Sequence, residues 1–163
     1  YVGKLRRTKQ DISLTYNLDE ILSKIDFSLT RSQLRSLKEI LEDSGKEISM
    51  NRLLIGDVGS GKTIVAMLVM LVFAKNSYQS AMMVPTEVLA IQQFEKYKDF
   101  MDSFGVELAL LTGSTKEKDE IKRRLKDGSI DMVVGTHALI EDDVDFKKLR
   151  LVVNDEPVSY THL

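Results

Sequence analysis

Residues 53–63 of the chain read Leu53-Leu54-Ile55-Gly56-Asp57-Val58-Gly59-Ser60-Gly61-Lys62-Thr63. This stretch places the pattern G-x-x-x-x-G-K-T between an apolar, strand-like run and an apolar, helix-like run. Its three glycines let the backbone turn tightly and point successive N–H groups at a bound anion. The N-terminus of the helix that follows adds further N–H groups and a positive dipole end. The pattern therefore predicts a loop, residues 56–63, that binds the phosphates of a nucleotide.

Two side chains at the end of this loop carry most of its chemistry. We expect Lys62 to reach the β- and γ-phosphates as a positive charge and so to act in catalysis. We expect the Thr63 hydroxyl to bind Mg²⁺, which prefers oxygen ligands and accompanies the nucleotide. The alternative is an ordinary glycine-rich turn between a strand and a helix. The strand-like run before the loop and the helix-like run after it favour the nucleotide site.

Beyond the loop, strand-like and helix-like patterns alternate. The strand-like runs lie at 52–55, 80–84, 107–111, 130–134 and 149–153, and the helical patterns lie at 62–75, 87–102 and 115–126. Such alternation predicts an α/β fold in which helices cover both faces of a mostly parallel sheet. Ligands bind sheets of this kind at the carboxyl ends of the strands, and every motif described below follows a strand-like run.

The chain before the loop reads as a linker and two helices. Residues 1–26 comprise a basic, apolar-poor linker and a short helix, for which Asn17 is the expected N-cap with Glu20 three positions later. A second helix is expected over residues 31–42. Its apolar face consists of Leu34, Leu37, Ile40 and Leu41.

Composition limits the class of protein. A chain of 163 residues fits one domain, and its net charge of -2 gives no overall field that would attract nucleic acid, so any nucleic acid must meet local patches. The absence of cysteine excludes disulfides and thiolate metal sites and fits a cytoplasmic location. The apolar run 64–74 is too short to span a bilayer, so we expect a buried helix and no membrane association.

Two carboxylates follow the last strand-like run, in the order Asn154-Asp155-Glu156. Opposite a phosphate-binding loop, Asp155 would hold Mg²⁺ through a water, and Glu156 would polarise the attacking water as a general base. The alternative is a polar exit from a strand into a turn. The loop upstream favours the catalytic pair.

Four strings, in order, carry a resemblance to a known family. They are Met50-Asn51-Arg52-Leu53-Leu54 before GDVGSGKT, then Pro85-Thr86-Glu87-Val88-Leu89-Ala90 with Gln92 and Gln93, then Thr112-Gly113-Ser114, and then Gly135-Thr136-His137-Ala138-Leu139. Over residues 27–156 the chain resembles superfamily 2 DNA helicases of the RecG type. The related Mfd translocases usually have Phe and Thr where this chain has Ser60 and Glu87, so the RecG type is favoured over an Mfd-like translocase.

This resemblance implies that residues 27–156 form the first RecA-like motor lobe of an ATP-dependent DNA helicase. Such an enzyme uses ATP and Mg²⁺ to remodel branched DNA, such as replication forks and recombination intermediates, in repair. It implies a monomeric, cytoplasmic parent with a second motor lobe and a wedge domain that this chain lacks. Two other classes stay open: a P-loop kinase or other small-molecule phosphotransferase, and a non-catalytic nucleotide-binding module.

The resemblance gives Gln33 a role in nucleotide recognition. Phe27 and Gln33 match the family motif F-x-L-T-x-x-Q, which implies that the Gln33 amide recognises the adenine edge. Thr30 with Gln33 is also a capping box, in which the glutamine side chain bonds back to the N–H of the cap residue. The residues alone favour the cap and the resemblance favours adenine, so both stay open.

The resemblance also implies contacts to the DNA backbone at the strand ends. The residues it assigns are Pro85, Thr86, Glu87, Thr112, Gly113, Gly135, Thr136 and His137. Hydroxyls and loop N–H groups suit this task because they hold phosphates without reading sequence. Each segment has a plainer alternative, with Thr86 and Thr112 as turn or cap residues, Ser114 and Glu117 as a capping box, and His137 as a packed loop histidine.

Two charged clusters are expected to be plain surface. The first consists of Lys116, Lys118, Lys122, Arg123, Arg124 and Lys126 on the helical pattern 115–126. Acidic residues interleave with it, and Glu120 is expected to pair with Arg124, which favours a solvated face over DNA contact. The second cluster lacks the spacing of a calcium loop and is expected to form an exposed turn. It consists of Glu141, Asp142, Asp143 and Asp145.

The match to the family stops after Glu156. The family continues with DEQH, whereas this chain reads Pro157-Val158-Ser159-Tyr160-Thr161-His162-Leu163, and the motif histidine does not carry over to His162. We expect residues 157–163 to be a non-native tail on a truncated reading frame. A strand of the sheet and the arginine finger of the second lobe would then be missing. We therefore predict that this chain alone binds ATP weakly and does not unwind DNA.

Overall fold

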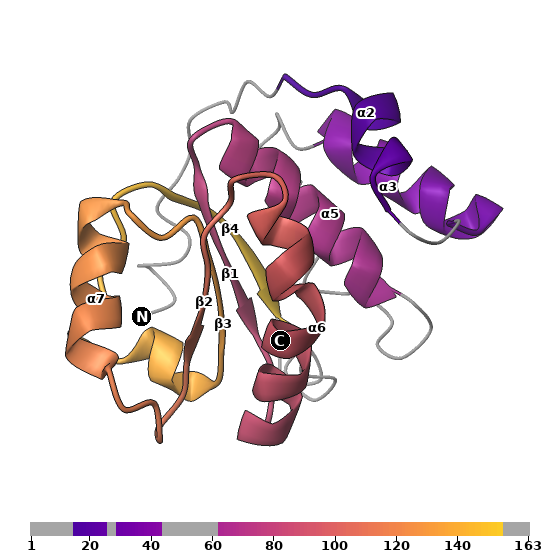
Figure 1. The fold of residues 1–163 in the computed structure, drawn as a ribbon. Helices are drawn as coiled ribbons and strands as arrows, with labels where there is room; N and C mark the ends of the chain where they lie inside the picture. The colour runs from indigo at the N-terminus through magenta and orange to yellow at the C-terminus, as the bar shows by residue number, and fades with distance from the viewer. Residues whose placement is uncertain (1–14, 26–28, 44–61, 155–163) are drawn as a thin grey trace.

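The computed structural model describes residues 15–25, 29–43 and 62–154. Two helices, α2 (Leu18–Ser23) and α3 (Arg31–Asp43), precede the alternating part of the chain (Figure 1). That part runs through α5 (Lys62–Lys75), β1 (Gln79–Met83), α6 (Glu87–Asp102), β2 (Leu108–Leu111), α7 (Lys118–Asp127), β3 (Met132–Gly135), the 3-10 helix η2 (His137–Ile140) and β4 (Leu149–Asn154). The four strands lie where the sequence predicts them, and the strand predicted at 52–55 lies outside the described residues.

The described strands form a parallel sheet in the order β2-β3-β1-β4. Their last residues share one register row: Leu111 lies beside Gly135, Gly135 beside Met83, and Met83 beside Asn154. The segments that follow these strands therefore leave the sheet from one edge, which we call the carboxyl edge. The predicted parallel sheet is confirmed.

Side chains alternate between the two faces of this sheet, as the pleat of a strand requires. Met82 and Val134 point to the face covered by α5 and α6, where the larger core lies. Met83 and Val133 point to the other face, where they pack in a smaller core with residues of α7 and η2. Helical elements cover both faces of the sheet, as predicted.

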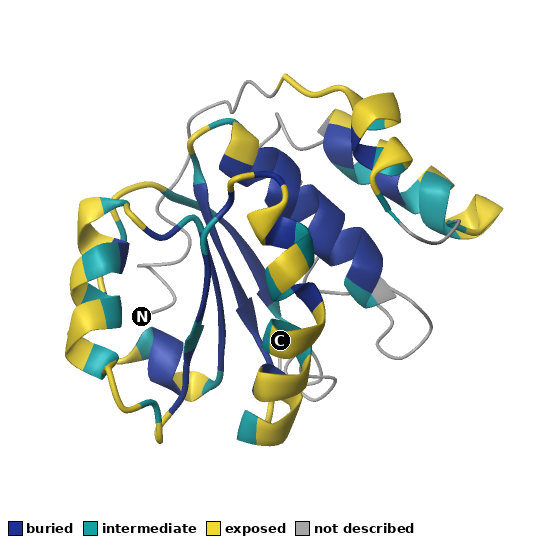
Figure 2. Ribbon diagram, in the orientation of Figure 1, coloured by how far each residue is buried: buried dark blue, intermediate teal, exposed yellow. Residues whose placement is uncertain are grey.

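Helix α5 is apolar on all sides because it is buried on all sides. Residues 64–74 are buried, and the helix lies between the sheet and α3 (Figure 2). This confirms the buried helix that the sequence predicts. In the part of the chain that the structure describes, no helix is both long enough and apolar enough to cross a membrane.

The sequence predicts N-terminal caps for four helices, and the structure confirms three of them. At the start of α2, Asn17 Oδ1 accepts a hydrogen bond from Glu20 N at 3.1 Å, as predicted. The predicted start of α7 is wrong, because the helix begins at Lys118 and its cap residue, Glu117, makes no side-chain hydrogen bond to it. The Ser114–Glu117 capping box is therefore also wrong. Ser114 bonds instead to a residue on another helix, described below.

At the opposite, amino edge of the sheet, the buried side chain of Gln79 joins three segments. Its Nε2 donates to the carbonyl oxygens of Leu125 and Ile130 at 2.9 and 2.8 Å. Its Oε1 accepts from Lys148 N at 2.8 Å. These bonds fix the end of α7 and the segment before β4 against the start of β1.

Candidate functional site

The carboxyl edge brings together the three motif segments to which the sequence assigns DNA contacts. Because Leu111, Gly135 and Met83 share a register row, the loops after β2, β3 and β1 begin side by side. The end of β4 lies in the same row at Asn154. The predicted catalytic residues Asp155 and Glu156 follow directly and lie outside the described residues.

The loop after β1 places Thr86 at the N-terminus of α6. Its backbone is extended, and its Oγ1 accepts from Leu89 N at 3.2 Å, so Thr86 is an N-cap. The cap role proposed as the plainer alternative is thus confirmed. It leaves the hydroxyl hydrogen of Thr86 free to donate, because a hydroxyl accepting one bond keeps its own donor. Pro85 and Thr86 are exposed at this edge.

The first residue of α6, Glu87, contacts the loop after β2. Its Oε1 accepts from Ser114 N at 3.0 Å, and the Ser114 hydroxyl lies 2.5 and 2.6 Å from the two carboxylate oxygens. The Ser114 hydroxyl and N–H lower the pKa of Glu87, and the Thr112 hydroxyl and Lys118 add to this effect. Glu87 is therefore a carboxylate at neutral pH. Local patterns cannot reveal this contact because it joins positions 27 residues apart.

The loop after β2 is a compact turn around Thr112. The Thr112 side chain is buried, its N–H donates to Thr115 Oγ1 at 2.8 Å, and its carbonyl accepts from Thr115 N at 3.2 Å. The role of Thr112 as a turn residue is confirmed. Gly113 and Ser114 lie at the exposed tip of this turn.

The loop after β3 is held closely against β2. Thr136 N lies 3.4 Å from the Leu111 carbonyl oxygen, and a Cβ added at Gly135 would overlap that same oxygen. Only glycine therefore fits here without a shift of the backbone. His137 follows at the start of η2 and is exposed, so the alternative of a packed histidine is wrong.

The predicted nucleotide site lies largely outside the described residues. Residues 56–61 of the loop, Phe27, Asp155 and Glu156 belong to those parts. Lys62 is the first residue of α5 and Thr63, half-buried, is the second, so the helix begins where the motif predicts. Because α5 ends just before β1 and its 14 residues span about 21 Å, its start lies toward the carboxyl edge.

Gln33 takes part in the predicted capping box. Gln33 Oε1 accepts from Thr30 N at 2.9 Å, and Thr30 Oγ1 accepts from Gln33 N at 3.0 Å. The cap is therefore confirmed, and the contact to adenine stays a prediction. The two roles are compatible in hydrogen-bonding capacity, since an amide oxygen has two lone pairs and the amide nitrogen has two donors.

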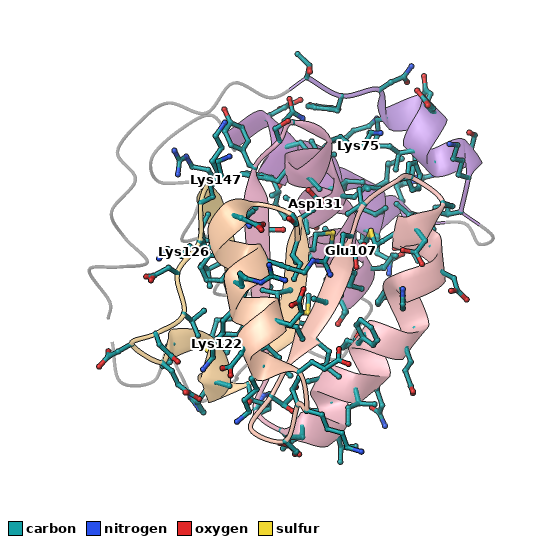
Figure 3. All side chains as sticks on the ribbon, turned by 60° about the vertical axis from the view of Figure 1, so that its left-hand side comes forward. Lys75, Glu107, Lys122, Lys126, Asp131 and Lys147 are labelled. Carbon is teal, nitrogen blue, oxygen red and sulfur yellow. The ribbon has the colours of Figure 1, made fainter. Side chains whose placement is uncertain are left out.

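The two charged clusters lie against each other. Lys122 lies on α7 (Figure 3). Its Nζ lies 2.8 Å from Asp143 and 3.8 Å from Glu141, and the hydrogen bond to Asp143 raises the pKa of Lys122. No group of acidic or histidine side chains among the described residues is arranged to hold a metal ion. The acidic turn thus neutralises part of the basic helix. Sequence reasoning missed this ion pair.

The predicted Glu120–Arg124 pair is wrong. Glu120 bonds instead to Arg123 Nη2, three positions on, at 2.6 Å. Arg124 lies 3.7 Å from Glu107, a carboxylate just before β2 that no local spacing could indicate. Both pairs are largely exposed, and pairs of this kind contribute little to stability.

Comparison with known proteins finds relatives of this chain among helicases. The family model described as DEAD/DEAH box helicase matches residues 30–157. The chain is 48% identical over 160 residues to the ATP-dependent DNA helicase RecG of Aquifex aeolicus, covering 94% of this chain and 20% of that protein. It is 44% identical over 156 residues to RecG of Bacillus subtilis, covering 93% of this chain and 23% of that protein.

A solved structure of RecG bound to a three-way DNA junction resembles the structure of this chain with a TM-score of 0.77. The two sequences are 36% identical, and the match covers 96% of this chain and 25% of the other. The chain thus spans about a fifth of the length of the relatives it matches. Because the family model matches most of its residues, the chain belongs to the DEAD/DEAH box helicase family.

Proposed function

We propose that this chain is the ATP-binding motor lobe of a RecG-type DNA helicase that remodels branched DNA in repair and recombination. The observation that carries the proposal is the shared register row of Leu111, Gly135, Met83 and Asn154. This register places the three motif loops and the end of β4, which directly precedes Asp155 and Glu156, at the carboxyl edge. The start of α5 lies toward the same edge. The relatives named RecG and the structure of RecG bound to a three-way DNA junction support branched DNA as the proposed substrate.

In this proposal the nucleotide lies at the start of α5. Backbone N–H groups of residues 56–61 and the ammonium group of Lys62 hold the phosphates, and Thr63 and Asp155 bind the accompanying Mg²⁺. Glu156 polarises the water that attacks the γ-phosphate, and Gln33 recognises the adenine as part of the sequence motif that begins at Phe27. Hydroxyl, carboxylate and water oxygens are the ligands that Mg²⁺ prefers, so this donor set fits the ion.

DNA lies across the exposed part of the carboxyl edge. The hydroxyl of Thr86, the N–H group of Gly113 at the exposed turn, and the segment from Thr136 to His137 offer donors to backbone phosphates. Such contacts position DNA without reading its sequence, as a protein that acts on branches of any sequence requires. A second motor lobe and a domain that engages the branch would complete the cytoplasmic, monomeric enzyme.

The test is the unwinding of a fluorescent three-way junction by the full-length protein, with Lys62→Ala as the variant. We expect ATP-dependent strand separation and DNA-stimulated ATP hydrolysis by the wild type, with both rates reduced at least about 100-fold in the variant. The matched control is Lys38→Ala, on the exposed surface of α3, which should leave both rates unchanged. ATP turnover that responds to a small-molecule acceptor and not to DNA would contradict the proposal.

A further inference from the structure

The Glu87–Ser114 contact joins two loops that do not follow neighbouring strands. Glu87 follows β1 and Ser114 follows β2, and β3 lies between these strands in the sheet. The contact therefore spans the end of β3, where Gly135 keeps the backbone close to β2. A carboxylate at the start of α6 thus sets the position of the loop tip in the middle of the proposed DNA-binding edge.

The groups around this carboxylate form an oxyanion site. Ser114 directs both its N–H and its hydroxyl at Glu87. The Thr112 hydroxyl and the positive charge of Lys118 also act on it. N–H and hydroxyl groups are among the donors with which proteins hold DNA phosphates. A carboxylate of the protein itself thus occupies a site with the chemistry of a phosphate site.

The contact is open to solvent. Ser114 is exposed and Glu87 is only half-buried. Water can replace either partner of a hydrogen bond in such a position, so breaking the bond leaves no buried polar group unsatisfied. An anion that approaches along the carboxyl edge can therefore displace the carboxylate without disturbing the core.

We propose that Glu87 occupies the oxyanion site of Ser114 in the free protein and that a DNA backbone phosphate displaces it on binding. This inference rests on the proposed function and refines it. An ionised carboxylate only accepts hydrogen bonds and repels a phosphate, so Glu87 does not bind DNA directly. Ser114 is the residue that contacts the phosphate. Glu87 is a positioning residue that holds the loop of Ser114 in place in the absence of DNA.

The test compares the affinity of the full-length protein for fluorescent single-stranded DNA at low salt, without nucleotide. Glu87→Gln keeps an acceptor for Ser114 N and removes the charge, so we expect binding to be about threefold to tenfold tighter. The gain should fade as salt is raised, because it arises from a charge near phosphates. Ser114→Ala should weaken binding severalfold. When Ser114 is already replaced by Ala, Glu87→Gln should raise the affinity for DNA no more than the control substitution Glu95→Gln does.

The matched control is Glu95→Gln, which removes the same charge from an exposed position two turns further along α6. Equal melting temperatures of all variants would show that the fold is kept. If Glu87→Gln binds DNA no more tightly than Glu95→Gln, or as weakly as Ser114→Ala, the contact is a structural brace and the inference is wrong. A wild type that neither binds DNA nor hydrolyses ATP would instead contradict the proposed function itself.

Discussion

At the scale of single residues, Gly135 is the position where the carboxyl edge tolerates least change. A methyl group there would overlap the Leu111 carbonyl oxygen and lie 2.9 Å from Leu139 Cγ. We expect Gly135→Ala to lower the free energy of unfolding by about 1–3 kcal/mol, the usual effect of overpacking. Chemical denaturation measures this. Gly113→Ala is the control, because its added methyl would meet Glu87 Oε1 only at 3.5 Å, and a similar loss there would contradict the steric explanation.

The Glu87–Ser114 contact should depend on pH in a defined direction. The Ser114 hydroxyl and N–H lower the pKa of Glu87 below 4.5, so the contact is fully present at neutral pH. It is lost as pH falls through this lowered pKa, when the carboxylate is protonated. NMR titration of the Glu87 carboxyl carbon measures the transition. Ser114→Ala should move the transition upward toward 4.5, and an unchanged transition would mean that Ser114 does not hold the carboxylate.

At the scale of elements, the start of α3 combines a cap with a predicted nucleotide contact, and substitutions can separate the two. Gln33→Glu keeps the acceptor for Thr30 N and loses the amide donor that pairs with adenine. We expect unchanged stability, about tenfold weaker ATP binding, and a reduced preference for ATP over GTP. Fluorescent nucleotide titration of the full-length protein measures both affinities.

Thr30→Ala is the complementary variant at the same helix start. It should cost about 1 kcal/mol of stability through the lost cap and leave the preference for ATP intact. If Gln33→Glu binds ATP and GTP as the wild type does, Gln33 is only a cap residue. The adenine role assigned from the family motif would then be wrong.

How far the sequence predicts these elements depends on how local their causes are. The bounds of α6 agree with the pattern, because Thr86 caps the helix and an apolar period continues to its end. The start of α7 does not agree, because the turn closed by Thr112 and Thr115 and the bond from Ser114 to Glu87 use the residues that would have begun it. Ser114 and Arg124 each bind a carboxylate on a distant segment, Glu87 and Glu107, in place of the local partner that the pattern predicts.

At the scale of the whole molecule, the sheet separates two edges with different roles. At its amino edge, hydrogen bonds of the buried Gln79 side chain join neighbouring segments. Its carboxyl edge carries exposed hydroxyl groups and the exposed loop tip at Gly113. The parallel topology alone was enough to predict that the motif segments would meet. The roles of residues 56–61, Asp155 and Glu156 in the nucleotide site stay predictions from the sequence motifs.

In the proposed function DNA lies along the carboxyl edge, and site-specific photo-crosslinking can locate it there. A benzophenone amino acid replaces Val88, which is 64% exposed beside the loop after β1, or Lys148, which is exposed at the amino edge. Each full-length variant is irradiated with a labelled three-way junction. We expect strong crosslinking from position 88 and background crosslinking from position 148. Equal yields from both positions, or a higher yield from position 148, would contradict this location of the DNA.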